Sequence, residues 1–264
     1  MTKKFASSAF LGIFLAWALG LGTIVPATGA EVPSAQEILR CTDDHMRGQT
    51  RQGRHELLVI TPRWTRHRYF EYWTKGYDKA FVRITDPESE RGTGSLKLGF
   101  NFWHYIAQAE RTIKLAPSLM LQPWIGSDFT NDDLVQMSSI SRDYTGTLVG
   151  EVEMQGFPAY QIKLVPHPNA PVVWGGLMVW TRKADCVPLK IEYYDEAGKL
   201  VRTLDYSEIK WFDDREIPAA LNMQWVKTPN RKSILRALEV KYNRPIPDHI
   251  FTIENLENRG EENL

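Results

Sequence analysis

The pattern of apolar and polar residues first predicts a helix. From Ser34 to Arg47 the apolar positions recur at helical spacing on one face, formed by Ala35, Ile38, Leu39, Thr42 and Met46. Ser34 and Glu37 fit the capping box that begins many helices, and Gly48 suits a C-terminal cap. The sequence therefore predicts one amphipathic helix over residues 34–47.

After residue 48 the pattern changes to alternation with a period of two. Turns rich in Gly and Asn separate the alternating segments, and Lys75-Gly76 is one of these turns. The segments are HELLVI, RYFEYWTKGYDKAFVRI, SLKLG, NFWHYIAQ, TGTLVGEVEM, YQIKLVP, GGLMVWTR, VPLKIEYYDEAGKLVRTLDYSEIKW, IPAALNMQWV and ILRALEVKY. Helices do not alternate with these strands, so we predict a mainly β (α+β) protein with a single curved antiparallel sheet of about eleven strands. The proline-rich stretch 165–173 is a candidate connection between two halves of this sheet.

The first thirty residues have the features of a secretory signal peptide. A charged start, MTKK, precedes an apolar stretch from Ala9 to Gly22 and a small-residue end at Ala30. A membrane anchor is the competing interpretation, but the apolar stretch is shorter than the roughly 20 residues of a spanning helix. We therefore predict a signal peptide over 1–30, a single domain over 31–264, and a periplasmic location.

Charge and cysteine content narrow the function classes. The chain holds 32 basic and 32 acidic residues, a balance that gives no reason to expect a nucleic-acid partner. Outside the cytoplasm Cys41 and Cys186 would be under oxidising conditions. The sequence alone does not show that they lie within bonding distance, and we expect no disulfide.

The acidic stretch GSDFTNDDLV, residues 126–135, raises the question of catalysis or metal binding. Thr130 and Asp133 match a helix-capping pair, which explains the acids without a ligand. A calcium loop that begins at Asp128 would need Gly and Glu where Asp133 and Ser139 stand. A hydrolase that uses two of Asp128, Asp132 and Asp133 remains an alternative.

Other catalytic motifs are missing from the sequence. The chain contains no nucleophile elbow, no phosphate loop and no His or Cys spacing typical of a zinc site. We therefore expect a protein that is not an enzyme and that has no cofactor and no metal.

Aromatic residues are concentrated between Trp64 and Trp124, and several are adjacent in sequence. Because adjacent strand residues face opposite sides, such a sheet is apolar on both faces. A closed core or a ligand cavity would both account for this.

Nearby, six arginines from Arg47 to Arg68 follow Asp44 with a single acid, Glu56, among them. Such a run is usually a solvated face, but beside an apolar groove it would suit phosphate head groups or an acidic partner.

A family resemblance extends over nearly the whole mature chain. It is carried by GTGSLKLG, NFWHYIAQAERTIKLAPSLM, GSDFTNDDLV, APVVWGGLMVW, VPLKIEYYDEAGKLVRTL and IPDHIFTIENL. In order and spacing these segments resemble the outer-membrane lipoprotein-sorting protein family, which is related to the periplasmic carrier LolA. The resemblance implies a half-open LolA-like β-barrel with short helices across its mouth. It supplies no catalytic residues.

The same resemblance implies a function and partners. The domain would bind the acyl chains of lipoproteins or phospholipid in an apolar cavity and carry them from an inner-membrane transporter towards the outer membrane. It would act as a monomer with transient membrane-surface contact. A periplasmic lipid or lipoprotein sensor that acts through a protein partner is the alternative.

The predicted site residues follow from this hypothesis. We expect Trp73, Phe81, Trp103 and Tyr105 to line the acyl-chain cavity, while an apolar loop, LAPSLMLQPWIG, covers it with Leu119, Met120 and Trp124. The first group depends on strand register, because a shift of one residue moves a side chain to the other face.

Overall fold

The computed structural model describes residues 32–136, 140–168, 170 and 172–258. The predicted signal peptide, residues 1–30, lies outside the described residues. From Pro33 onward the chain forms one compact unit, and its strands join a single antiparallel sheet. In this part of the chain no helix combines the length and the apolar character needed to cross a membrane.

The sheet contains thirteen strands, where the sequence pattern predicts about eleven. One reason is β6, a four-residue edge strand too short to show an alternation. In chain order the strands are β1 (Thr50–Ile60), β2 (Thr65–Lys75), β3 (Lys79–Asp86), β4 (Gly94–Leu98), β5 (Asn101–Ile106), β6 (Arg111–Lys114), β7 (Tyr144–Met154), β8 (Phe157–Pro166), β9 (Gly176–Arg182), β10 (Pro188–Tyr194), β11 (Leu200–Phe212), β12 (Arg215–Trp225) and β13 (Lys232–Tyr242).

The order of the strands leaves the sheet open. It runs β6-β5-β4-β3-β2-β1-β13-β12-β11-β10-β9-β8-β7, so β1 pairs with β13 in the middle, and β6 and β7 form the two edges. The sheet is not closed. Because β6 and β7 follow each other in the chain, residues 115–143 must pass from one edge to the other. The stretch 165–173, predicted to join two halves, instead links the neighbouring strands β8 and β9.

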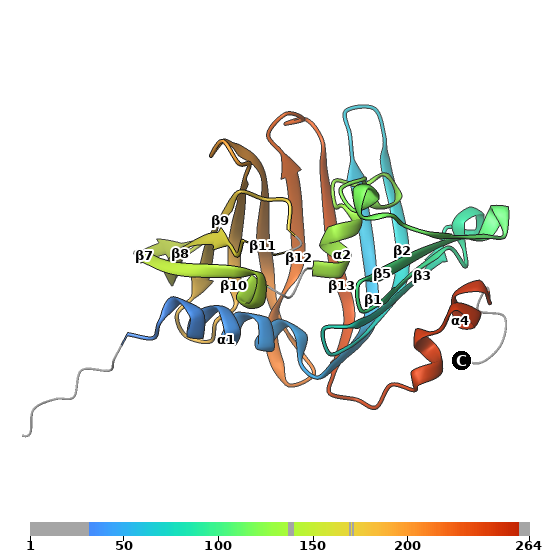
Figure 1. Cartoon of the computed structure of the whole chain (residues 1–264), viewed down its shortest axis with the longest axis horizontal. Coiled ribbons are helices and arrows are strands. Elements are labelled where there is room, and N and C mark those ends of the chain that lie inside the picture. Colours follow the sequence, from blue (N-terminus) through green and yellow to red (C-terminus); the bar gives the residue numbers. More distant parts are fainter. Residues whose placement is uncertain (1–31, 137–139, 169, 171, 259–264) are drawn as a thin grey trace, which may run out of the picture. The chain divides into compact units, whose positions relative to one another are not determined.

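Short helices accompany the sheet. They are α1 (Ala35–Arg47), α2 (Asn131–Gln136), α3 (Ile140–Asp143) and α4 (Ile253–Glu257), with 3-10 turns at Glu88–Glu90, Ala107–Ala109, Pro117–Leu119, Trp124–Gly126 and Asp248–Phe251. The first helix is confirmed together with its signals: Ser34 and Glu37 form the capping box, and Gly48 ends the helix with φ at 62°. Figure 1 shows α1 and α2 lying over the same face of the sheet.

The two faces of the sheet carry separate cores. We call the inner face the one that α1 and α2 cover; its core includes Leu57, Phe70 and Val82 together with Ile38 and Leu39 of α1. Helix α1 approaches β7 closely at Gly146, where an added Cβ would lie 2.8 Å from Cδ1 of Leu39. We call the other side the outer face. Near β2–β5 the C-terminal residues Ile246, Phe251 and Leu256 cover it.

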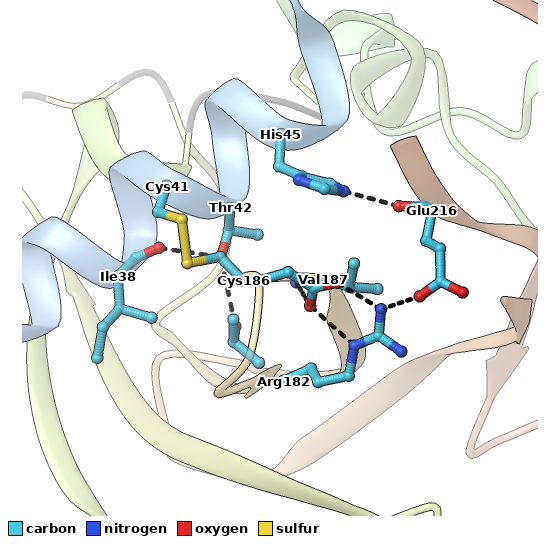
Figure 2. Close-up of a disulfide and its surroundings, with 10 residues drawn as sticks. Ile38, Cys41, Thr42, His45, Arg182, Cys186, Val187 and Glu216 are labelled. Carbon is cyan, nitrogen blue, oxygen red and sulfur yellow. Dashed lines mark hydrogen bonds and ion pairs between the residues drawn. A yellow bond between two sulfur atoms is a disulfide. The ribbon is translucent and has the colours of Figure 1, made fainter. Parts of the chain in front are cut away.

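A disulfide joins α1 to the sheet, and the prediction of unpaired cysteines is wrong. Cys41 bonds Cys186, which lies between β9 and β10, with 5.8 Å between the Cα atoms (Figure 2). The sequence separation of 145 residues gave no distance information; the sheet brings the two together. Beside the bond, Thr42 lies 3.5 Å from Thr181, and the His45 ring contacts the carbonyl oxygen of Glu216 at 2.7 Å.

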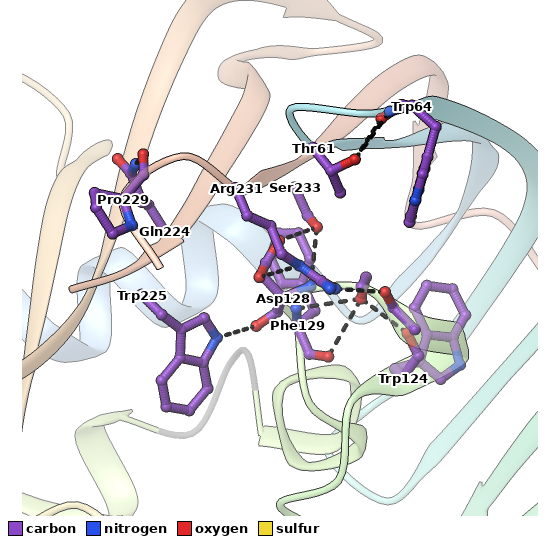
Figure 3. Close-up of polar contacts among 12 residues, drawn as sticks. Thr61, Trp64, Trp124, Asp128, Phe129, Gln224, Trp225, Pro229, Arg231 and Ser233 are labelled. Carbon is purple, nitrogen blue, oxygen red and sulfur yellow. Dashed lines mark hydrogen bonds and ion pairs between the residues drawn. The ribbon is translucent and has the colours of Figure 1, made fainter. Parts of the chain in front are cut away.

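The crossing segment, residues 115–143, is fixed to the inner face at successive points. Trp124 donates its Nε1–H to Ser95 on β4 and packs edge-to-face on Phe70 of β2. Asp128 accepts hydrogen bonds from Ser233 at 2.6 Å and from Arg231 at 2.9 Å (Figure 3). The segment is thereby bound to β2 and β4 on one side of β1 and to β13 on the other.

Asp133 provides the next attachment and answers the question raised by the acidic stretch. Thr130 and Asp133 exchange the two hydrogen bonds of a capping box, as predicted. The same carboxylate accepts two hydrogen bonds, at 2.6 and 2.7 Å, from Arg202 of β11, whose side chain is completely buried. The guanidinium lies 4.3 Å from the ring centroid of Trp174 and 4.1 Å from that of Tyr193. These acids hold the crossing segment in place.

We expect the disulfide to stabilise the fold strongly. Replacing both cysteines, Cys41→Ser with Cys186→Ser, frees a long loop in the unfolded chain and should lower the free energy of unfolding by about 2–5 kcal/mol. Urea denaturation measures the loss. Wild-type protein unfolded under reducing conditions should have the same free energy of unfolding as the variant. If the urea midpoint of the variant equals that of the oxidised wild type, the disulfide does not stabilise the fold.

The Asp133–Arg202 pair should behave as a buried ion pair. Asp133→Asn leaves a buried guanidinium without its counter-charge, so we expect a loss of about 3–5 kcal/mol in the same assay. Replacing both partners, Asp133→Leu with Arg202→Met, should recover much of that loss. Asp214→Asn breaks an exposed pair with Arg215 and serves as the control, with an effect under about 1 kcal/mol. Equal losses in Asp133→Asn and in the control would refute the assignment.

Candidate ligand-binding cavity

A cavity lies on the inner face between α1, the C-terminal part of the crossing segment and the middle of the sheet. Its volume is about 80 Å³. The first helix and strands from both halves of the sheet contribute to it, because the β1–β13 pairing brings those halves together. The cavity is therefore a product of the topology and of the way α1 is held.

One part of the cavity wall is apolar. Figure 1 shows the elements that meet here, with α1 below and α2 in front of the strands. The apolar side chains that line it are Leu39, Met46, Phe70, Leu134, Ile140, Val179, Ile191, Leu221 and Leu235. A space bounded in this way binds hydrocarbon, since burial of apolar surface is the dominant favourable term.

A second cavity continues the apolar space. It has a volume of about 50 Å³ and is lined by Leu177, Trp174 and Leu204 among others. Ile140, Ile191 and Tyr206 border both cavities, so the two spaces are neighbours.

The other part of the wall carries cationic and phenolic groups. Arg47, at the last turn of α1, is 6% exposed, and its guanidinium carbon lies 3.1 Å from the ring centroid of Tyr77. Arg142 lies 4.7 Å from the same centroid. Burial lowers the pKa of Arg47 below its ordinary value. Within the described residues, Nε and Nη2 of Arg47 have no hydrogen-bond partner.

Arg51 and His55 of β1 extend this polar part. The Arg51 guanidinium lies 5.7 Å from the Tyr72 ring, and its Nη2 is 3.4 Å from Nε2 of His55. Because arginine can only donate, Nε2 of His55 accepts and the ring proton resides on Nδ1. His55 is 4% exposed and stacks on Phe70. Burial, with a smaller contribution from Arg51, lowers the pKa of His55 to about 3, so the ring is neutral.

The charges around the cavity favour a negative ligand. Four cationic side chains line it, Arg47, Arg51, Lys79 and Lys97, against one carboxylate, Asp43. Asp43 accepts a hydrogen bond from the Ser141 backbone N–H, and burial raises the pKa of this carboxyl. Two of the cations have partners within the protein: Lys97 donates to the Tyr77 carbonyl, and Lys79 pairs with Asp248.

The four strand residues predicted to line the cavity lie on the outer face. Phe81 and Tyr105 are buried there, and Trp73 and Trp103 pack against the same outer core under the C-terminal residues. They do come together, but none borders the cavity. The difference is one of register, because on β2 the inner residue is Tyr72 and not its neighbour Trp73. A role of these four residues in ligand binding stays a prediction.

The three residues predicted as a lid lie on the crossing segment but not at the cavity. Trp124 is 2% exposed and belongs to the inner core, whereas Leu119 is exposed and Met120 is half-buried. Their role in ligand binding likewise stays a prediction. The elements that do border the cavity from this segment are α2, through Leu134, and α3, through Ile140.

The cavity residues that sequence reasoning missed are Arg47, Tyr72, Tyr77 and their apolar neighbours. The run of arginines was a usable signal for Arg47, Arg51 and His55. No signal showed which arginines point inward. Asp128 and Asp133 are both held in hydrogen bonds and ion pairs. These two residues therefore do not form the pair of free carboxylates that the hydrolase alternative needs.

His55 should make the fold sensitive to acid. Its pKa is about 3 in the folded protein and 6.5 in a free chain, so between these values only the unfolded state binds the proton. Unfolding therefore becomes easier as the pH falls below 6.5, by up to about 1.4 kcal/mol per pH unit. His55→Phe keeps an aromatic ring against Phe70 and removes this dependence.

The test compares free energies of unfolding for wild type and His55→Phe from neutral pH down to mildly acidic pH. Contributions from carboxyl groups are common to both proteins and cancel in the difference. The difference should change steadily in the acidic range and stay constant above it. Parallel profiles throughout would show that His55 takes up no proton on unfolding.

Three solved structures resemble this one. A DUF1329 family protein from Desulfovibrio piger matches with a TM-score of 0.78 at 16% identity, over 84% of this chain and 97% of that one. A LolA superfamily protein from Nitrosomonas europaea matches with a TM-score of 0.72 at 22% identity, over 85% and 100%. A domain assigned as an outer membrane lipoprotein-sorting protein, from Vibrio parahaemolyticus, matches with a TM-score of 0.74 at 20% identity, over 84% and 98%. At these identities the likeness shows the fold.

The amino-acid sequence of the chain matches a protein family. No curated protein matches the chain. A family model described as "-like: Uncharacterized protein" matches residues 76–258, which is more than half of the 264 residues. The resemblance predicted from the sequence is confirmed: the chain belongs to the family that this model describes, and it has the fold of the LolA superfamily and of the outer-membrane lipoprotein-sorting domain.

Proposed function

We propose that this protein is a periplasmic carrier that binds an acyl chain of a lipid or lipoprotein in the cavity beneath α1. In this proposal it receives the chain from an inner-membrane transporter and moves it towards the outer membrane. The observation that supports it most is the apolar cavity on the inner face of an open LolA-like sheet. The Cys41–Cys186 disulfide fits an oxidising compartment outside the cytoplasm.

The size of the cavity suits a carrier, which must release what it binds. A volume of about 80 Å³ accommodates about six water-sized groups. Burial of about six methylenes would contribute about 5 kcal/mol before the costs of association are deducted, so the dissociation constant would be about 0.2 mM or weaker. The neighbouring cavity, which shares three lining side chains with this one, is a further apolar space beside it. Binding of this strength is reversible, and a receptor could reverse it.

The elements around the cavity favour entry of a chain without unfolding of the sheet. Leu134 and Ile140 reach the cavity from α2 and α3, which are only six and four residues long. The strands that form the rest of the wall belong to one hydrogen-bonded sheet, with register shifts at Arg54/His55 and between Pro188 and Lys190. In this proposal a chain enters and leaves at this border, while Asp133 keeps α2 attached to Arg202 and the sheet stays intact.

Filling the cavity should block acyl binding. Leu235 of β13 is half-buried and lines the cavity, so Leu235→Trp would occupy the space of the hydrocarbon. We expect its affinity for a fluorescent fatty acyl probe to fall by about tenfold or more. Leu238→Trp changes an exposed residue of the same strand and serves as the matched control.

Fluorescence titration of the three proteins measures the effect, and circular dichroism checks that both variants fold. Wild type and Leu238→Trp should bind the probe alike. If Leu235→Trp folds and binds as tightly as wild type, the chain does not occupy this cavity. If no protein binds any acyl probe, the carrier proposal itself is wrong.

A further inference from the structure

We infer that the cavity binds an amphiphile with an anionic head, a carboxylate or a phosphate, seated at Arg47 and Arg51 while its hydrocarbon chain follows the apolar wall. This inference rests on the proposed function and specifies its cargo. A single site would then recognise the two ends of one molecule by different chemistry.

The unpaired donors are the first observation. Among the described residues, Nε and Nη2 of Arg47, Nε of Arg51 and Nδ1 of His55 are buried and have no hydrogen-bond partner. All three side chains line the cavity, and Arg47 and His55 are more than nine-tenths buried. A buried donor without an acceptor is unfavourable, most of all on a cation. An anionic oxygen among these groups would accept from several of them together.

The aromatic contacts of the arginines do not replace an acceptor. Arg47 lies against Tyr77, and Arg51 lies near Tyr72 and at 5.9 Å from Tyr242. A ring face attracts a guanidinium and holds its plane in one orientation. The N–H groups at the edge of that plane still need acceptors. Stacking thus fixes the guanidinium planes, whose edge N–H groups suit a carboxylate or a phosphate.

The balance of charge supports the same ligand. Asp43 is the one carboxylate lining the cavity, and it already accepts the Ser141 N–H. The guanidinium groups of Arg47 and Arg51 therefore face the cavity with an excess of positive charge. A neutral lipid head, such as the acylated amino terminus of a lipoprotein, would leave Asp43 as the only carboxylate lining the cavity beside these cations. A fatty acid or a phospholipid would supply one.

The two parts of the wall lie at a distance that one amphiphile can cover. Phe70 stacks on His55 within the inner core, and Leu39 and Met46 stand on the same helix as Arg47. Polar and apolar lining residues are thus neighbours on α1, and His55 of β1 lies against Phe70 of β2. A head at the arginines places the first methylenes of its chain directly against apolar side chains.

The test measures binding of decanoate, decyl phosphate, decanol and inorganic phosphate by calorimetry at neutral pH. The three amphiphiles share one chain and differ only in the head. We expect decanoate or decyl phosphate, or both, to bind wild type at least about tenfold more tightly than decanol, and inorganic phosphate to bind more weakly than decyl phosphate. The comparison of the carboxylate with the phosphate identifies the source of the head.

Variants locate the head. Arg47→Met and Arg51→Met keep the length of the side chain and remove its charge, and each should weaken binding of the anionic amphiphiles by about tenfold while decanol binding changes little. Arg54→Met alters an exposed arginine of the same strand and serves as the control. Arg51 is less buried than Arg47, so its variant tests the site even if Arg47→Met does not fold.

The outcomes separate this inference from the proposed function. Equal binding of decanol and the anions would overturn the head-group site while the carrier proposal stands. An equal loss for charged and neutral ligands in both arginine variants would also overturn it. Inorganic phosphate that binds as tightly as decyl phosphate would exclude an amphiphile. Failure of all three amphiphiles to bind wild type would contradict the carrier proposal itself.

Discussion

The position of β6 and β7 at opposite edges of one open sheet is the constraint on which the rest of the structure depends. Consecutive strands usually pair, but here the connection between them has to cross the inner face. Because an apolar face cannot remain exposed, this connection also covers it. Trp124 fills space above β2 and β4, Asp128 binds β13, and Asp133 binds Arg202 of β11. The acidic stretch that first suggested chemistry is the set of attachments that holds this cover.

The cavity is the space that α1 and the crossing segment leave open between them on the inner face. Helix α1 is bonded to the sheet through Cys41 and Cys186, and the crossing segment is bonded through its aspartates. Neither cover fills the middle of the sheet, where Leu221, Leu235 and Phe70 face inward. The last turn of α1 brings Arg47 to the end of this space, and β1 brings Arg51 and His55. An apolar space with cations at one end follows from these placements, and an acyl chain with an acidic head matches both.

Sequence patterns predicted much of the fold because helix caps and strand alternation are local. The capping boxes at Ser34 and Thr130 appear as expected, and so does the antiparallel sheet. The site depends on features that are not local. Two adjacent aromatics on β2, Tyr72 and Trp73, fit either face equally well, and only the pairing of the strands decides which points inward. The disulfide was missed for the same reason, since 145 residues separate its cysteines.

The most direct test of the central claim is to locate a bound chain by nuclear magnetic resonance, in protein with labelled methyl groups of Ile, Leu and Val and with decanoate as the ligand. The account predicts intermolecular nuclear Overhauser effects to inner-face methyls of Val179, Ile191 and Leu235, which line the cavity. Effects confined to Leu96 and Leu98, which belong to the outer core beside Trp73 and Trp103, would contradict it and would place the chain on the other side of the sheet.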